Sequence, residues 1–344
     1  MVDRRRTVTR RAWRALGSVV VGCCTVACAV AASCARPALA RSPTTRFWAF
    51  TGPWDPRSAA SAISHQRSLD VVVSGWIGLD TITGAPFIRY PDSIPRRARG
   101  TQYMALVTSE LNERFRPAVV RALAADPARL ASAAGWIAAT SRRARYSGLV
   151  IDFESHDAAD LPALLIVLRA IADSSRAHGV SQIAVAIPAL DTLAYPARPL
   201  LAIADVVIVM LYDEHWNRSS PGPIASPQWV RVALGARVRE AGPDRVIAGF
   251  PLYGYRWRTG SDSTAATVGF EDARDAAALN HTALSRDSAS FTLHATSADG
   301  SETWVADAVL LDSLVRIARA DGVARVALWR LGLEDPAVWS RISR

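Results

Sequence analysis

The feature that most constrains the fold is a regular alternation between short apolar runs and longer segments of helical period. Eight runs rich in Val, Ile and Ala each precede a segment rich in Ala, Leu and Arg. Strands that are covered on both faces are almost continuously apolar, so this alternation predicts successive βα units around a parallel sheet. The runs are residues 47–50, 69–76, 103–108, 148–154, 183–188, 206–212, 246–253 and 323–331.

Eight such units within roughly 300 residues predict an α/β protein that closes into a (β/α)8 TIM barrel, for which about 250 residues is typical. The intervening segments, such as 161–177 and 228–241, are long enough for crossover helices, and the Ala/Arg-rich stretch 118–144 is typical of surface helices. One interval, residues 258–307, is too long for a plain connection. Its helix-like part (271–279) and strand-like parts (291–295 and 302–305, joined by a turn at 298–301) predict a small α+β insertion between strands seven and eight.

The charge of the chain is concentrated at its amino end. The first 40 residues contribute +6 of the formal +9, and the near balance of the remainder argues against a nucleic-acid binder, which needs a concentrated basic face. A basic segment, an apolar stretch and the small residues Ala38-Leu39-Ala40 are typical of a secretory signal. We therefore expect residues 1–40 to be removed during export to the periplasm or the extracellular space. Residues 41–344 then form the barrel, with no membrane span.

All four cysteines, Cys23, Cys24, Cys28 and Cys34, lie inside this leader. Cleavage after Ala40 leaves a mature protein without a disulfide or a cysteine-ligated metal. Two alternatives stay open for the leader: lipid attachment at Cys34, and retention of the apolar stretch as a membrane anchor.

The candidate chemistry is in the fourth run, where Asp152 and Glu154 are two residues apart. Alternate side chains of a strand share a face, so both carboxylates are expected to point toward the barrel axis at its carboxyl end. Two such groups cannot both ionise cheaply, and one should hold a proton that it can donate. Glycoside hydrolysis needs such an acid together with a negative charge. From these residues alone, helix capping or pairing with arginine is an equally good interpretation.

Four segments resemble strands of glycoside hydrolase family 18, in the family's order. Residues 146–154 resemble its Asp-Gly-x-Asp-x-Asp-x-Glu strand, residues 210–213 its Met-x-Tyr-Asp strand and residues 249–254 its seventh strand, while Trp329 stands at the place of the eighth-strand tryptophan. The similarity is greatest to the branch that contains spore-cortex-lytic enzymes and domains associated with polysaccharide deacetylases, through residues 53–56, 72–79, 300–307 and 331–336.

The resemblance implies a mechanism and a set of site residues. It implies substrate-assisted, retaining hydrolysis of β-linked N-acetylhexosamine glycans, with no metal or organic cofactor and a monomeric enzyme. Glu154 is then the acid, Asp152 orients the substrate's acetamido group, and Tyr212 donates a hydrogen bond to it. Trp329 forms the floor under the sugar, since an aromatic face suits a pyranose. The implied substrate-binding residues are Asp213, Met210, Trp329, Tyr253, Trp76 and Trp216.

The departures from the family pattern leave a second function open. Ser147 and Val150 replace the first two aspartates, and Phe153 stands where many members have Trp. Val150 should face inward beneath Asp152, so slower turnover or a shifted pH optimum is expected. The alternatives are a glycan-binding barrel of the cell envelope without turnover and a scaffold for polysaccharide synthesis. Weaker candidates for substrate contact are His156, His215, Trp54 and Trp257, each as well explained by packing or loop structure.

Overall fold

The computed structural model describes residues 44–258 and 264–342. The expected signal segment, with its cleavage site and its four cysteines, lies outside the described residues. In the described part of the chain, no helix combines the length and the apolar character required to cross a membrane.

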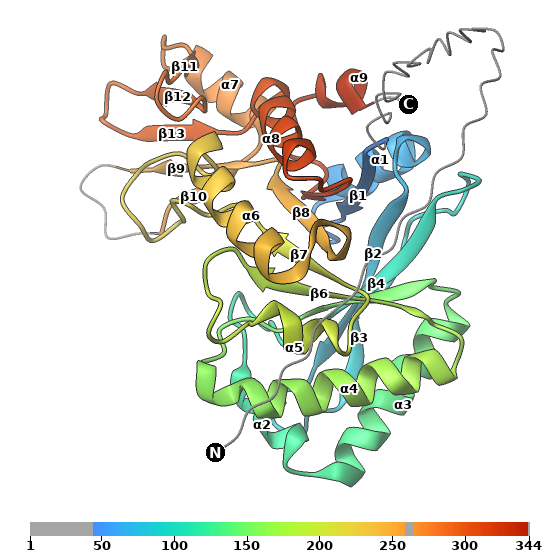
Figure 1. The fold of residues 1–344 in the computed structure, drawn as a ribbon. Helices are drawn as coiled ribbons and strands as arrows, with labels where there is room; N and C mark the ends of the chain where they lie inside the picture. Colours follow the sequence, from blue (N-terminus) through green and yellow to red (C-terminus); the bar gives the residue numbers. More distant parts are fainter. Residues whose placement is uncertain (1–43, 259–263, 343–344) are drawn as a thin grey trace, which may run out of the picture. The chain divides into compact units, whose positions relative to one another are not determined.

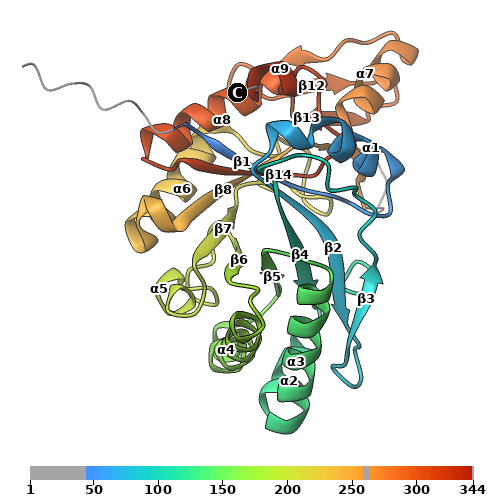
Figure 2. The ribbon, with the colours of Figure 1, turned by 90° about the vertical axis from the view of Figure 1, so that its right-hand side faces the viewer.

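Eight parallel strands close into a barrel, because β1 pairs with β2 on one side and with β14 on the other (Figure 2). The order around the barrel is β1-β2-β4-β5-β6-β7-β8-β14. The predicted (β/α)8 architecture is thereby confirmed. The strands are β1 (Arg46–Phe50), β2 (Val71–Leu79), β4 (Gln102–Thr108), β5 (Gly148–Asp152), β6 (Gln182–Pro188), β7 (Val206–Met210), β8 (Val246–Pro251) and β14 (Arg325–Trp329).

Helices lie around the outside of the strands (Figures 1 and 2). Three begin at a capping side chain followed by proline: Asp55, Asp126 and Ser226 each accept a hydrogen bond from a backbone N–H of the first turn. These local signals explain why the helices begin where they do. The helices are α1 (Pro56–His65), α2 (Pro117–Ala124), α3 (Pro127–Arg143), α4 (Leu161–Ala177), α5 (Ala197–Leu201), α6 (Pro227–Ala241), α8 (Ala308–Ala320) and α9 (Val338–Ile342), with short 3-10 turns at Gln66–Ser68, Ala158–Asp160 and Pro243–Arg245.

The core has two shells that follow the alternation of side chains along each strand. One shell, which includes Val73, Leu106, Val150 and Ile208, fills the barrel interior. The other shell joins the outer faces of the strands to the helices. The interior is thus packed with apolar side chains below the carboxyl ends of the strands, and polar chemistry is confined to that end.

The insertion between β8 and α8 forms a second, antiparallel sheet in the order β10-β9-β13-β12-β11, with α7 beside it (Figure 1). The predicted helix and both predicted strands are present, whereas the sequence pattern did not predict β9, β10 and β11. At Gly254 a Cβ would lie 1.9 Å from the Trp304 carbonyl oxygen, so only glycine permits this close pairing. The elements are β9 (Gly254–Trp257), β10 (Ala266–Val268), α7 (Phe270–Leu279), β11 (Ser285–Arg286), β12 (Leu293–Thr296) and β13 (Glu302–Val305).

Two features differ from the sequence-based prediction. Strand β3 (Pro86–Tyr90) forms a hairpin with β2 and was not predicted, because this edge strand is only partly buried and lacks a continuous apolar run. Strand β5 ends at Asp152 instead of Glu154. Its pairing stops there: Thr108, the last residue of β4, pairs with Asp152, and the pairing with β6 ends at Ile151. Glu154 therefore lies in the loop, two residues beyond the end of the strand.

Candidate active site

Asp152 and Glu154 lie together at the carboxyl end of β5. The intervening Phe153 is buried in the outer shell, so the two acids are on the opposite, inner side of the chain. Their carboxyl groups share a hydrogen bond. Each side chain keeps a partly exposed surface and is otherwise enclosed by protein. The structure therefore brings the two predicted acids together, even though Glu154 is beyond the last paired residue.

Enclosure by protein changes the acidity of both groups. Burial raises the pKa of Glu154 well above its usual range, and the charges of Asp152 and Asp213 raise it further. Burial also raises the pKa of Asp152, to about 7, although its hydrogen bond with Glu154 acts in the opposite direction. Two carboxyl groups in this arrangement hold one proton between them near neutral pH. The protonated member of such a pair can act as a general acid beside the other member, which is ionised.

Tyr212 and Asp213 follow β7 and face the acid pair. Burial raises the pKa of Tyr212 well above its usual range, and the charges of Glu154 and Asp152 contribute. The phenol therefore keeps its proton and can donate a hydrogen bond. Asp213 has a left-handed backbone (φ 61°), and its Oδ1 accepts hydrogen bonds from the Tyr253 hydroxyl at 2.5 Å and the Tyr255 hydroxyl at 3.1 Å. These two bonds fix Asp213 in a strained conformation.

A continuous series of ring contacts crosses the carboxyl end of the barrel, and we call it the aromatic row. Trp329, at the end of β14, is its centre: its ring centroid is 6.3 Å from that of Trp76 and 6.5 Å from that of Tyr212. Aromatic faces of this kind suit the apolar faces of sugar rings. The members of the row, in spatial order, are Tyr90, Trp54, Trp76, Trp329, Tyr212, Tyr253, Tyr255 and Trp257.

The remaining predicted residues have different surroundings. Met210 ends β7 and is buried, and Trp76 is only 4% exposed, so either contacts a ligand only through a small surface. Trp216 is 46% exposed on the loop after β7 and does not belong to the aromatic row. His215, on the same loop, uses its Nδ1 to bind the Ser220 carbonyl oxygen. His156 is wrong as a substrate contact, because its side chain is fully buried.

The inner positions of β5 have the expected departures. Val150 is fully buried in the barrel interior beneath Asp152, among apolar side chains. The Ser147 hydroxyl donates a hydrogen bond to the Tyr103 carbonyl oxygen at the other end of the strand. Among the described residues, Asp152 Oδ1 has no hydrogen-bond partner. This oxygen is buried, so one acceptor of the pair is enclosed without a partner.

Glu110, which follows β4, is a charged neighbour of the pair that the sequence pattern did not predict. The negative charge of Glu110 contributes to the raised pKa of Asp152, so it lies near the pair. Arg89 of β3 holds it by a salt bridge and by a hydrogen bond to its carbonyl oxygen. An acid two residues beyond the end of a barrel strand is the signal that could have identified it.

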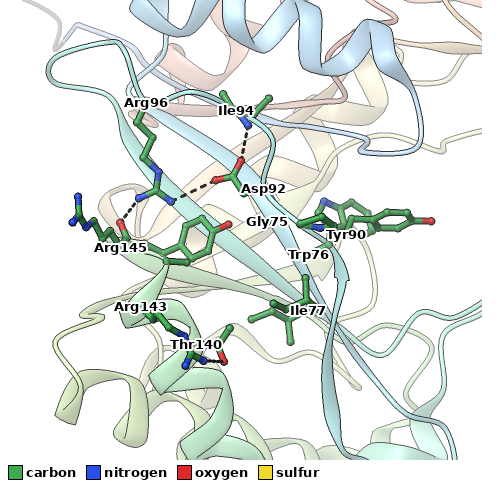
Figure 3. A pocket seen from close by; sticks show the side chains of 14 residues that line it. Gly75, Trp76, Ile77, Tyr90, Asp92, Ile94, Arg96, Thr140, Arg143 and Arg145 are labelled. Atoms are coloured by element: carbon green, nitrogen blue, oxygen red, sulfur yellow. Dashed lines mark hydrogen bonds and ion pairs between the residues drawn. The ribbon is translucent and has the colours of Figure 1, made fainter.

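A cavity of about 390 Å³ lies elsewhere, lined by β2, β3, residues 91–96 and the end of α3 (Figure 3). Within it, Arg96 binds Asp92 and the Arg145 carbonyl oxygen. Trp76 and Tyr90 contribute to this cavity and also to the aromatic row, but none of the acids at the end of β5 or β7 lines it. The cavity therefore adjoins one end of the aromatic row without including the acids.

No family model matches the chain. Over 215 residues, which is 59% of this chain and 62% of the relative, the sequence is 24% identical to an uncharacterised glycosylase, YvbX, of Bacillus subtilis. The alignment thus spans less than two thirds of that protein.

Solved structures give a broader match. The spore cortex-lytic enzyme SleL of Bacillus cereus superposes with a TM-score of 0.76 at 18% identity, over 88% of this chain and 74% of SleL. A chitinase of Chromobacterium violaceum superposes with a TM-score of 0.74 at 20% identity, over 87% of this chain and 98% of the chitinase. The chain has the chitinase-like barrel fold. The predicted resemblance is thereby confirmed at the level of the fold.

Proposed function

We propose that the chain is an exported glycoside hydrolase that cleaves β-linked N-acetylhexosamine glycans, such as peptidoglycan, chitin-like chains or poly-N-acetylglucosamine. The observation that carries the proposal is the enclosed pair of Asp152 and Glu154 at the carboxyl end of the barrel, with Tyr212 and Asp213 close enough for their charges to interact. A raised pKa on one of two adjacent carboxyl groups is what acid-catalysed bond cleavage requires near neutral pH.

The chemistry follows from the placement of these groups. Glu154 gives its proton to the glycosidic oxygen while the substrate's acetamido oxygen attacks the anomeric carbon, so that the bond to the leaving sugar breaks. The ionised Asp152 stabilises the positive oxazolinium ring, and Tyr212 donates a hydrogen bond to the acetamido group. Water then opens the ring and returns a proton to Glu154. The Trp329 face supports the sugar whose bond is cleaved.

The names of the matched proteins support the substrate class. They include a glycosylase, a spore cortex-lytic enzyme and a chitinase. The first 40 residues have the pattern of a secretory signal, which supports export. Export agrees with the proposed substrates, because polymers of this kind lie outside the cytoplasmic membrane.

The test is an assay for new reducing ends. The purified chain and its Glu154→Gln variant are incubated with peptidoglycan, chitooligosaccharides and poly-N-acetylglucosamine. We expect the unaltered chain to release reducing ends and the variant to lose about 100-fold or more of that rate, since it cannot donate the proton. Glu271→Gln is the matched control, because Glu271 is exposed on α7. Equal release by the unaltered chain and Glu154→Gln would contradict the proposal.

A glycan-binding barrel without turnover is the second candidate. Val150 favours it, since an apolar side chain replaces the carboxylate that the family pattern places beneath Asp152. Binding of a polymer by the unaltered chain, with no reducing ends released at any pH, would establish this function instead.

A further inference from the structure

The segment that carries Glu154 is held by a buried side chain from a neighbouring loop. The Tyr195 hydroxyl donates a hydrogen bond to the Phe153 carbonyl oxygen at 3.0 Å and accepts one from the His156 N–H, also at 3.0 Å. It therefore bridges the backbone on both sides of Glu154. Tyr195 is 2% exposed, so water does not compete for these bonds.

The bridged segment contains a strained residue. Ser155, directly after Glu154, has a left-handed backbone with φ 62°. Such a conformation in a residue with a side chain persists only where the surrounding contacts impose it. The two hydrogen bonds of Tyr195 fall on either side of Ser155 and are suited to impose it.

Tyr195 is itself fixed by a buried arginine. Arg237 of α6 is fully buried and donates hydrogen bonds to four carbonyl oxygens, one at the end of β6 and three in the loop between β6 and α5. One of them is that of Tyr195, at 2.9 Å. An ion pair with Glu240 at 3.1 Å balances part of the guanidinium charge. The other three carbonyl groups belong to Pro188, Ala189 and Asp191.

The far side of the segment has a second anchor. The His156 ring is fully buried, and its Nδ1 lies 3.2 Å from Asp160 Oδ2. Asp160 in turn accepts two hydrogen bonds from Arg121 of α2, at 2.9 and 3.0 Å. Hydrogen bonds thus connect the segment after β5 to α2 on one side and, through Tyr195, to α6 on the other.

We infer that Tyr195, locked in place by Arg237, is a positioning residue that holds the Glu154 carboxyl group at the distance and orientation needed for proton transfer. This inference rests on the proposed function. Tyr195 does not transfer a proton itself, because its hydroxyl already serves the backbone on both sides of the acid. Displacement of a reacting group by about 1 Å can reduce turnover about 100-fold, so a single buried hydroxyl is sufficient to control the rate.

The test replaces Tyr195 by Phe, which keeps the ring and removes both hydrogen bonds. We expect kcat to fall about 10- to 100-fold while KM stays within about twofold, because the substrate-binding surface is unchanged. The alkaline limb of the pH profile should also move to lower pH. A loosened segment exposes the Glu154 carboxyl group, which then loses its proton more readily despite the neighbouring Asp152 and Asp213.

Tyr103→Phe is the matched control. Tyr103 is 5% exposed and donates its hydroxyl hydrogen to Gln66 Oε1 at 2.6 Å, near the amino end of β4. Both variants lose one buried hydroxyl, so they should lose similar thermal stability, but Tyr103→Phe should keep its kcat. A Tyr195→Phe variant that keeps its kcat and pH profile, or a Tyr103→Phe variant that loses as much, would overturn the inference.

Hydrogen exchange separates this inference from the proposed function. The amide of His156 should exchange at least tenfold faster in Tyr195→Phe and be unaffected in Tyr103→Phe. If the unaltered chain hydrolyses no polymer, the proposed function is wrong. The inference that Tyr195 positions Glu154 for turnover is then wrong as well, whatever the exchange rates are. If the chain hydrolyses glycans and exchange at residues 153–157 is unchanged in Tyr195→Phe, only the inference about Tyr195 fails.

Discussion

The indole ring of Trp329 lies nearly parallel to the phenol ring of Tyr212, with 12° between their planes and 6.5 Å between their centroids. The charges of Glu154 and Asp152 contribute to the raised pKa of Tyr212, so Tyr212 lies near the acid pair. Trp329 therefore connects the acid pair to the aromatic row. A sugar stacked on the row at this point would present its glycosidic bond to the acids.

Replacing Trp329 by Leu should weaken substrate binding. The variant loses an aromatic face for the pyranose, so KM is expected to rise about tenfold, with a smaller change in kcat. Initial rates of reducing-end release over a range of chitooligosaccharide concentrations give both constants. Trp339→Leu is the control, because Trp339 stacks on His65 and does not belong to the aromatic row. Equal effects of the two variants would exclude a specific role for Trp329.

The pH profile of hydrolysis should be bell-shaped, with both limbs at higher pH than those of an ordinary carboxyl pair. Activity requires one proton on the pair, so it falls at low pH when Asp152 is protonated and at high pH when Glu154 loses its proton. Because the pKa of Asp152 is about 7, the acidic limb should lie near pH 7. Measurements of kcat/KM from pH 4 to pH 10 test this. An acidic limb near pH 4 would contradict the raised pKa.

Glu154→Gln should be more stable than the unaltered chain at alkaline pH. The pKa of Glu154 is raised by folding, so the folded state binds the proton more tightly, and stability declines as pH rises above the ordinary carboxyl pKa. Gln has no carboxyl proton to lose, so the variant should escape this loss of stability at pH 9. Melting curves at pH 4 and pH 9 should therefore diverge only at pH 9. The same difference in Glu271→Gln would point to a general charge effect.

Val150→Asp should be destabilising even though it restores the family pattern. The position is fully buried among apolar side chains, and an ionised or unpaired carboxyl group there costs about 3 kcal/mol or more. Thermal unfolding at pH 8 provides the measurement, with Val150→Ala as the control for lost volume. An unchanged melting temperature together with faster turnover would show that the site already accommodates a third inner acid.

Arg237→Met should destabilise the chain by about 3–5 kcal/mol. The substitution leaves four carbonyl groups, at the end of β6 and in the loop after it, and the Glu240 carboxylate without their partner. Denaturant unfolding should show this loss, whereas Arg239→Met should have little effect, because Arg239 is exposed on the same helix. A loss below about 1 kcal/mol would mean that water replaces the guanidinium.

The sequence by itself determined the barrel, because eight apolar runs with intervening helical segments leave few other ways to bury those strands. It also placed Asp152 and Glu154 on one side of the chain where β5 ends, since alternation of side chains is a local property. The tertiary structure alone decided which groups meet these acids. Glu110 and Tyr195 reach them through the pairing of neighbouring strands and the course of long loops, and Arg237 fixes one such loop by contacts 42 to 49 residues away in the chain. Contacts of that range depend on how the whole barrel closes, and no local spacing encodes them.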